Sequence, residues 1–221
     1  MKKSKKILIT LSAIIGFLII SSHIGYRILV LYDLKKVISQ IKDGGHVSPA
    51  WYINIFEKDE LISHFVYNEV PVYVITDKAI NRLYHNTGTS YVPGIGIILD
   101  TAIWNLKESC DDIFYQFIFA HECGHAINRK ISGNDYFSIP IHDSDIDTVI
   151  KYESKADAYA ILATNISDDE YIDIRNWINF EYSEIGRTAL ENGDRKMISL
   201  LKEVTMSQIN TTLELLSSTH E

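Results

Sequence analysis

The chain begins with a long uncharged run that differs from the mixed polarity of the rest. Four lysines stand among the first six residues, and no Asp, Glu, Lys or Arg occurs from Ile7 to Tyr26. Twenty residues in an α-helix measure about 30 Å, which is the thickness of the hydrocarbon layer of a bilayer. The pattern predicts a transmembrane helix over residues 7–27, preceded by a basic tail over residues 1–6.

The charges on the two sides of this run predict its topology. The lysines precede it and Arg27 follows it closely, so the positive-inside rule places residues 1–6 in the cytoplasm and the rest of the chain on the extracytoplasmic side. A cleaved signal peptide is the alternative, but its apolar part would be shorter and would end at a small-residue cleavage site. Ser21 and Ser22 stand near that end without an alanine. We therefore expect an uncleaved signal anchor and a single-pass membrane protein.

The next segments show helical and then strand-like spacing of apolar residues. Residues 28–45 predict a helical stalk that ends at Gly44-Gly45, because glycine commonly terminates helices. Ser48-Pro49 predicts the start of another helix, since proline is favoured in the first turn, and this helix runs through the Trp51–Phe65 region with breaks possible along it.

Two segments rich in β-branched residues predict a small sheet. Val70–Thr76 is the first strand, and its Pro71 is typical of an edge strand or of a strand start. Tyr91–Asp100 is the second strand, and a short helix over Asp77–Asn86 separates the two.

From there the chain is predicted to be helical. A polar loop over Gly133–Asp145 separates the first two long helices, and Ser167 with Glu170 forms a capping box that opens a third. The predicted helices are Asp111–Lys130, Asp147–Asn165, Ser167–Leu190 and Asp194–Ser217. The sequence thus predicts an α+β fold, mostly helical with a small sheet, in one domain over residues 46–221.

Charge and cysteine content narrow the classes of function. All 29 acidic side chains but only 16 of the 21 basic ones follow residue 27, which gives that part a net charge of −13. Such a domain repels nucleic acid, and no basic stripe is present, so we expect no nucleic-acid partner. Cys110 and Cys123 lie on the same predicted helix about 20 Å apart, too far for a disulfide. Both are expected to be free thiols.

One short motif within the helix predicted over Asp111–Lys130 carries candidate chemistry. His121-Glu122-Cys123-Gly124-His125 has the H-E-x-x-H spacing of zinc peptidases. Histidines four apart leave the same face of a helix one turn apart, so both imidazoles can reach one Zn²⁺ at about 2.0–2.1 Å. Glu122 is offset by about 100° around the axis. Its carboxylate therefore lies beside the metal, where it can take a proton from zinc-bound water.

Two histidines on a helix can also be solvated or satisfied core residues. The residues from 113 to 120 are nearly all apolar, however, as is typical of a buried helix. Three polar side chains inside such a helix are costly unless something satisfies them, which a bound cation does. We predict one zinc ion per chain, with His121 and His125 as ligands and Glu122 as the catalytic residue.

The third ligand is predicted from the helix over Asp147–Asn165. Asn128 and Ile131 exclude the class of site that takes its third histidine six residues after the second. Glu153 and Asp157 stand four apart and share one helix face. We expect Glu153 to be the third ligand and Asp157 to orient a ligand histidine through its other ring nitrogen. An ordinary charged helix face is the alternative, and the competing donors are Asp135, Asp143, Asp145, Asp147 and His142.

These motifs resemble those of a known class of enzymes. His121-Glu122-x-x-His125 followed by Glu153-x-x-Ala156-Asp157 is similar to the gluzincin zinc metallopeptidases, especially the membrane-associated family of CAAX prenyl proteases and heat-shock membrane proteases. Phe119-Ala120 fits the same pattern. The ImmA/IrrE-type regulatory peptidases are the second choice, but they usually carry Asn where Asp157 stands. The chain departs from the first family at Gly193-Asp194-Arg195, which has the family's arginine without its His-Pro.

The resemblance implies a zincin-like catalytic domain and a membrane-anchored zinc endopeptidase that acts on a protein or peptide substrate. The group that stabilises the transition state stays open among Tyr159, His142, Arg195, Tyr182 and Arg187. Zincins keep a substrate-binding edge strand just before the zinc helix. Gly94, Ile95, Gly96 and Ile97 stand at that place, although a plain core strand fits them equally well.

Two other functions remain open. One is a regulatory protease that cuts a single partner protein, which uses the same chemistry on a narrower substrate. The other is a non-catalytic membrane protein with a structural zinc site, which would require a fourth protein ligand.

Overall fold

The computed structural model describes residues 45–46, 48–84, 88–108, 112–132 and 146–218. Several predictions fall outside these residues: the basic tail, the transmembrane helix over residues 7–27, nearly all of the stalk, Cys110, and the loop that holds Asp135, His142, Asp143 and Asp145. No helix in the described part of the chain combines the length and the apolarity needed to cross a membrane.

A four-stranded mixed sheet forms one side of the molecule. Its strands are β1 (Leu61–Tyr67), β2 (Val70–Ile75), β3 (Ser90–Val92) and β4 (Gly96–Asp100), in the order β1-β2-β4-β3. β1 and β2 are antiparallel, β2 and β4 are parallel, and β4 and β3 are antiparallel. Every residue of β2 and β4 is buried, because both strands have neighbours on each side and helices on both faces.

The helix predicted through Trp51–Phe65 is wrong over most of its length. Only α2 (Pro49–Tyr52) and a 3₁₀ turn (Ile53–Ile55) are helical, and β1 follows. Half-buried residues alternate with exposed ones from Leu61 to Val66, which is the period of a strand. Asn68 and Glu69 both have positive φ, 46° and 69°, so they form the tight turn that folds β1 back onto β2.

The second predicted strand is really two strands joined by a turn. The chain reverses at Pro93-Gly94-Ile95, where Gly94 has a φ of 78° that glycine adopts without strain. β3 and β4 flank this turn and pair with each other. Pro71 is the second residue of β2, an inner strand, so its position at a strand start is confirmed and the edge-strand interpretation is wrong.

The remaining chain is helical, as predicted, with one additional break. The helices are α3 (Asp77–Tyr84), α4 (Thr101–Leu106), α5 (Asp112–Ser132), α6 (Ile146–Thr164), α7 (Asp168–Trp177), a π-helix (Ile178–Tyr182), α8 (Glu184–Glu191) and α9 (Arg195–Ser218). The helix predicted over Ser167–Leu190 is interrupted at Ser183, which is extended and caps α8 by accepting from the Gly186 amide. A Cβ on Gly186 would come within 2.0 Å of the Asn179 carbonyl oxygen, so the sharp bend requires glycine there.

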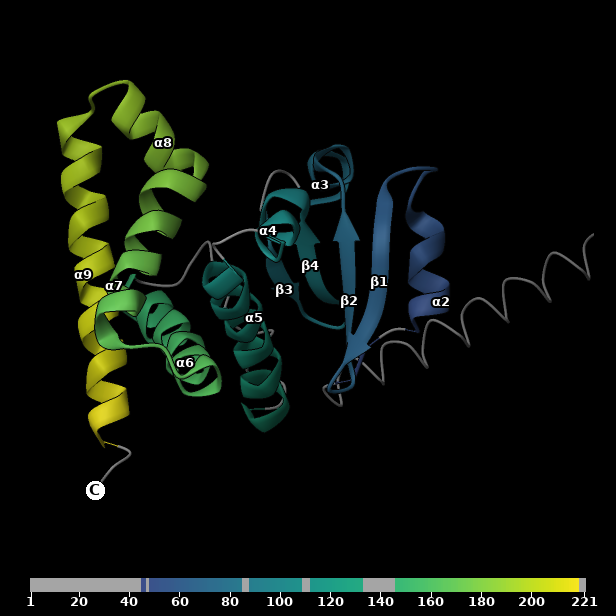
Figure 1. The fold of residues 1–221 in the computed structure, drawn as a ribbon, viewed down its shortest axis with the longest axis horizontal. Helices are drawn as coiled ribbons and strands as arrows, with labels where there is room; N and C mark the ends of the chain where they lie inside the picture. The colour runs from purple at the N-terminus through teal and green to yellow at the C-terminus, as the bar shows by residue number, and fades with distance from the viewer. Residues whose placement is uncertain (1–44, 47, 85–87, 109–111, 133–145, 219–221) are drawn as a thin grey trace, which may run out of the picture.

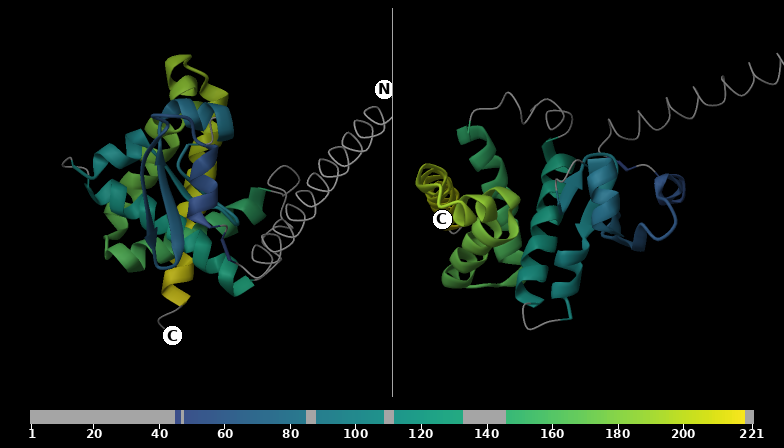
Figure 2. Two further views of the ribbon diagram at one scale, coloured as in Figure 1. Left: turned by 90° about the vertical axis from the view of Figure 1, so that its right-hand side faces the viewer. Right: turned by 90° about the horizontal axis from the view of Figure 1, so that it is seen from above.

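Helix α5 is the central element of the molecule. Figures 1 and 2 show it between the sheet on one side and helices α6 to α9 on the other. On the sheet side Phe119 contacts Phe65 of β1, and on the helical side Gly124 lies against Ala156 of α6. The predicted α+β fold, mostly helical with a small sheet, is confirmed, and its core surrounds α5.

Candidate metal centre

The middle of α5 buries three polar side chains. His121, Glu122 and His125 are each 6% exposed. They lie there because the sheet and α6 cover this part of α5 on two sides. Burial at this depth requires each side chain to have a partner.

A carboxylate from α6 meets the two histidines. Glu153 Oε2 lies 3.2 Å from Nε2 of His121 and 3.5 Å from Nε2 of His125, and the two Nε2 atoms are 3.0 Å apart. Gly124 makes this possible, because a Cβ there would lie 3.0 Å from Ala156 backbone atoms and would push α6 away. The three buried or half-buried side chains lie close enough to hold a metal ion.

The other ring nitrogen of His121 faces a second carboxylate. His121 Nδ1 lies 2.7 Å from Oδ1 of Asp157, which is fully buried. Asp157 can accept a proton donated by Nδ1, which would leave Nε2 available to a cation on the side of Glu153 and His125. Asp157 thus occupies the position that its spacing from Glu153 predicted.

Asp157 is itself held by a polar network that the sequence did not reveal. Arg175 of α7, 5% exposed, forms an ion pair with both carboxylate oxygens, and its Nε lies 2.8 Å from Oδ2. Gln208 of α9 donates to the same Oδ2 at 2.8 Å, and the Tyr171 hydroxyl lies 2.8 Å from it. Two helices, α7 and α9, therefore fix one carboxylate, which in turn fixes His121.

The two histidines differ in their support. His125 stacks on Tyr152 with ring centroids 4.6 Å apart, and its buried Nδ1 has no hydrogen-bond partner among the described residues. His121 has a charged partner on each nitrogen. His121 is therefore the more rigidly oriented of the two.

The electrostatics of the site favour a cation. Burial alone would lower the pKa of His121, but its hydrogen bonds to the carboxylates of Asp157 and Glu153 raise it to about 9. Burial alone would raise the pKa of Glu153, but hydrogen bonds with the two histidines hold it well below the usual range. Arg175 and His121 outweigh the effect of burial on Asp157 and lower its pKa to about 2. Both carboxylates are therefore ionised at neutral pH, and the charge they attract can be a proton or a metal ion.

Glu122 lies on the sheet side of the metal centre. Its Oε2 accepts from the Tyr91 backbone amide of β3 at 2.5 Å. Burial is the main cause that raises the pKa of Glu122, opposed by the two neighbouring histidines. A buried carboxylate with a raised pKa next to a potential metal site is suited to accept and return a proton.

The predicted substrate strand is at a different place in the sheet. Gly96 and Ile97 belong to β4, which pairs with β2 and β3 and so has no free edge, while Gly94 and Ile95 form the turn. The strand beside Glu122 is β3, Ser90–Val92, which is an outer strand of the sheet. The prediction of an edge at residues 94–97 is wrong because one predicted strand became a hairpin.

The predicted transition-state groups do not gather at the site. Tyr159 lies on another face of α6, where it lines a pocket with Tyr67 and Cys123. The Tyr182 hydroxyl donates a hydrogen bond to Asp100. Arg187 and Arg195 are exposed on α8 and α9. His142 lies outside the described residues.

Cys123 is a buried free thiol on the opposite face of α5, as its position predicted.

Arg175 is the site residue that sequence reasoning missed. One signal was available: Tyr171, Ile174 and Arg175 fall on one face of α7 at spacings of three and four, and all are buried. A charged residue on the apolar face of a helix requires a buried partner of opposite charge.

Comparison of the chain with protein families, curated proteins and solved structures found no match. The function is therefore inferred from the side chains of this protein.

Proposed function

We propose that this chain is a zinc-dependent endopeptidase of the gluzincin type, anchored in a membrane by residues 7–27. The observation that carries the proposal is the convergence of two imidazole nitrogens and one carboxylate oxygen at separations of 3.0, 3.2 and 3.5 Å. Ligands in a tetrahedron around zinc, at about 2.0–2.1 Å from it, lie roughly 3.3 Å from one another. Two histidines and a glutamate are also the ligand set of several zinc peptidases.

The chemistry of the site supports peptide hydrolysis. Bound zinc would lower the pKa of a water molecule toward 7 and polarise the scissile carbonyl. Glu122 would accept the proton of the attacking water and deliver it to the leaving amine. Its burial favours this role, because a carboxylate with a raised pKa exchanges protons more readily near neutral pH.

The surroundings of the ligands support a stable site. Asp157 would hold the ring of His121 in the orientation and tautomer that direct Nε2 at the metal. Arg175 keeps Asp157 ionised and in place. Glu153 would close the site from α6, and its side chain is 31% exposed, which leaves access from solvent.

A structural zinc site in a non-catalytic protein explains less. Structural sites are usually closed by four protein ligands, whereas the group of potential ligands in the described residues has three members. Such a site would also give Glu122 no reason to be buried beside it. A protease of one regulatory partner would use the same site, so it differs in substrate and not in mechanism.

Metal content of the purified full chain tests the site. We expect one zinc per wild-type chain and a loss of zinc in His125→Ala. His64→Ala is the matched control, because His64 is an exposed histidine on β1. A folded wild type that takes up no zinc, or a His125→Ala variant that keeps it, contradicts the proposal.

Hydrolysis of a peptide library, followed by mass spectrometry, tests the chemistry. Glu122→Gln should keep its zinc and lose at least a hundredfold in cleavage rate, because general acid–base catalysis contributes about 10²–10⁴-fold. Glu181→Gln, at an exposed position in the π-helix, is the control. Equal cleavage by Glu122→Gln and wild type would overturn the mechanism, while the zinc content would still report on the site.

A further inference from the structure

A pocket lies on the face of α5 that points away from His121 and His125. Its walls come from β1, the end of α4, α5 and the C-terminal half of α6, and its volume is about 450 Å³. Small-molecule sites typically measure about 300–1,000 Å³ and are mostly apolar with a few polar groups. The pocket lies outside the metal centre, and the proposed function leaves it unused.

Aromatic rings form the inner part of this pocket. Phe65, Trp104, Tyr115 and Phe119 form a closed ring of contacts, in which neighbouring ring centroids are 5.9 to 6.3 Å apart. Tyr67 adds a further edge-on contact to Phe119 at 5.1 Å. Because each ring packs on two others, the wall is preformed, and an apolar ligand would not have to order it.

One cation lies at this aromatic wall. Lys107 Nζ is 4.5 Å from the centroid of the Trp104 ring, an attractive arrangement of an ammonium group over an indole. Of the described residues that line the pocket, Lys107 is the one that carries a charge. No described carboxylate forms an ion pair with it. The chain as a whole has a net charge of −8. An ammonium group at this apolar wall, without an ion-pair partner in the described part of the chain, can therefore attract an anionic ligand that the rest of the chain would repel.

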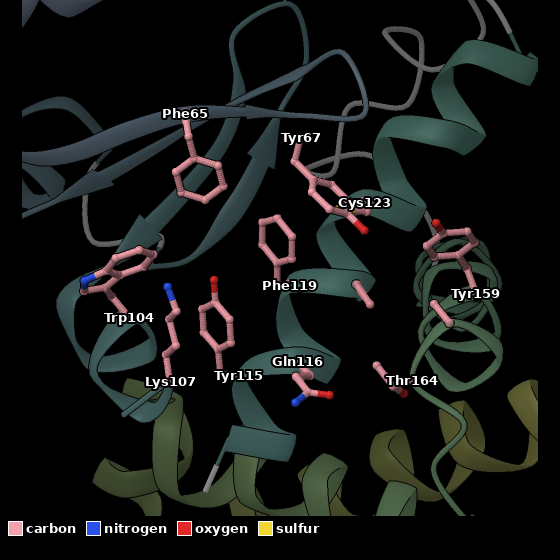
Figure 3. Close-up of a pocket in the computed structure, with 12 residues that line it drawn as sticks. Phe65, Tyr67, Trp104, Lys107, Tyr115, Gln116, Phe119, Cys123, Tyr159 and Thr164 are labelled. Atoms are coloured by element: carbon pink, nitrogen blue, oxygen red, sulfur yellow. The ribbon is translucent and has the colours of Figure 1, made fainter. Parts of the chain in front are cut away.

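A second donor points into the same part of the pocket as this cation. Figure 3 shows the amine of Lys107 and the hydroxyl of Tyr115 pointing in the same direction, into the space below Phe65. Burial raises the pKa of Tyr115, so its hydroxyl keeps its proton at neutral pH. An ammonium and a phenol that point into the same space can both donate to one carboxylate. The nearby acid Asp112 is held by the Gln116 amide at 2.5 Å.

We propose that this pocket binds a small apolar carboxylate, an aryl-alkanoate or short fatty acid, with its carboxylate on Lys107 and Tyr115. The apolar part would lie against Phe119 and Tyr67 and extend toward Ala163 of α6. A cationic ligand would be repelled by Lys107. A neutral apolar ligand would bury the ammonium without a counter-charge, which is unfavourable.

Saturation-transfer NMR with 4-phenylbutyrate and the full chain tests this pocket. The neutral analogue 4-phenylbutanol, which keeps the ring and the chain but lacks the charge, is the matched probe. We expect phenylbutyrate to bind about tenfold more tightly than phenylbutanol. Lys107→Gln should remove that difference, because hydrogen bonds to charged groups exceed neutral ones by about this factor. Ala163→Trp, at an exposed position on the pocket wall, should block both probes.

Two controls separate the pocket from other sites. Lys202→Gln removes an exposed lysine of α9 and should leave both affinities unchanged. An unchanged circular-dichroism spectrum and melting temperature show that each variant is folded, whether or not it holds zinc. Equal binding of the two probes to wild type, no binding at millimolar concentration, or unchanged binding to Ala163→Trp would each overturn the proposal. Binding of a peptide with a C-terminal phenylalanine but not of phenylbutyrate would also overturn it, in favour of a peptide terminus.

Discussion

The charged side chains at the centre of the molecule are arranged in pairs, and Arg175 with Asp157 is the most buried pair. The Arg175 side chain is 6% exposed and that of Asp157 is 0% exposed, and their neighbours Tyr171 and Gln208 also direct polar groups at the carboxylate. A pair at this depth contributes to stability only while both partners are present. Its importance for the metal centre is that Asp157 also holds His121.

Substitution of Arg175 should lower both stability and zinc affinity, and a second substitution at Asp157 should restore part of the stability alone. We expect Arg175→Met to lower the free energy of unfolding by about 3–5 kcal/mol, because it leaves a buried carboxylate without its cation. Asp157→Asn/Arg175→Met should recover part of that loss, since the unpaired charge is gone. Zinc affinity should fall about 10–100-fold in both variants, because the partner of His121 is altered.

Denaturant titration and competition with a zinc chelator measure these two effects. Arg187→Met, at an exposed position on α8, is the control for loss of an arginine. Stability restored together with full zinc affinity in the double variant would show that Asp157 does not position His121.

A second buried carboxylate, Glu60, gives a prediction for pH. Its partner is Arg82, whose side chain is 36% exposed. The hydrogen bond to Arg82 lowers the pKa of Glu60 from 4.5 to about 2. A carboxyl whose pKa is lower in the folded state stabilises the protein above its unfolded pKa. That contribution is lost as the pH falls from about 4.5 to about 2.

Glu60→Gln should therefore reduce the pH dependence of stability. We expect the melting temperature of wild type to fall further between pH 6 and pH 3 than that of the variant. Glu203→Gln, an exposed glutamate of α9, should keep the wild-type difference. The same fall in Glu60→Gln and wild type would show that this ion pair does not contribute to acid stability.

The site residues that could be predicted from sequence are those related by local spacing. His121 and His125, or Glu153 and Asp157, stand one helical turn apart, so helix geometry alone places each pair on one face. Arg175 lies on another helix, and nothing local shows which carboxylate it meets. Its contact with Asp157 depends on the packing of α7 against α6, which only the tertiary structure reveals.

Helix packing controls how closely the two halves of the metal site approach. His121 and His125 lie on α5 and Glu153 on α6, and the two helices touch where Gly124 meets Ala156. A Cβ at residue 124 would lie 3.0 Å from the Cα and the carbonyl oxygen of Ala156. These are backbone atoms, so they cannot move aside as a flexible side chain could.

We expect Gly124→Ala to weaken zinc binding at least tenfold with little loss of stability. Overpacking costs about 1–3 kcal/mol, but alanine in a helix gains about 1 kcal/mol over glycine, so the two effects nearly offset each other. The separation of α5 and α6 would nevertheless move Glu153 away from the histidines. Cys123→Ala is the matched control, because it trims the neighbouring residue without separating the helices, and unchanged zinc affinity in Gly124→Ala would contradict this view of the interface.

The long helices α5, α6 and α9 were predictable because each stretch carries apolar residues over many turns without a proline. The hairpin of β1 and β2 was not, since Ile62 and Val66 are apolar yet exposed and so obscure the alternation of the strand. The break at Ser183 was missed because Ser183-Glu184 can stand either at the start of a helix or within one, and no proline or glycine directly precedes it. That bend requires glycine at residue 186, because a Cβ there would collide with the Asn179 carbonyl oxygen, and this close approach is a property of the packed structure.

The molecule as a whole consists of a sheet half and a helical half joined through α5. The side-chain contacts between the two halves could not be predicted from the sequence. Tyr182 of the π-helix donates to Asp100 at the end of β4 and accepts from the Thr89 amide at 3.1 Å. Its ring stacks on Trp177, with centroids 5.5 Å apart. The two hydrogen bonds of Tyr182 span more than eighty residues, and they hold the start of β3, whose Tyr91 amide donates to Glu122.

Tyr182→Phe should therefore loosen the sheet half first. The variant keeps the ring and its stacking but leaves Asp100 and the Thr89 amide without this partner, which costs about 1–3 kcal/mol. We expect hydrogen exchange to accelerate more in Gly88–Val92 than in α9, and peptide cleavage to fall more than zinc content, because Glu122 loses its fixed neighbour while the metal ligands stay in place. Tyr67→Phe, which removes an exposed hydroxyl, should change neither. If exchange rises equally in both halves, or zinc is lost together with cleavage, the Tyr182 contact supports the fold as a whole and has no particular role in placing β3 against Glu122.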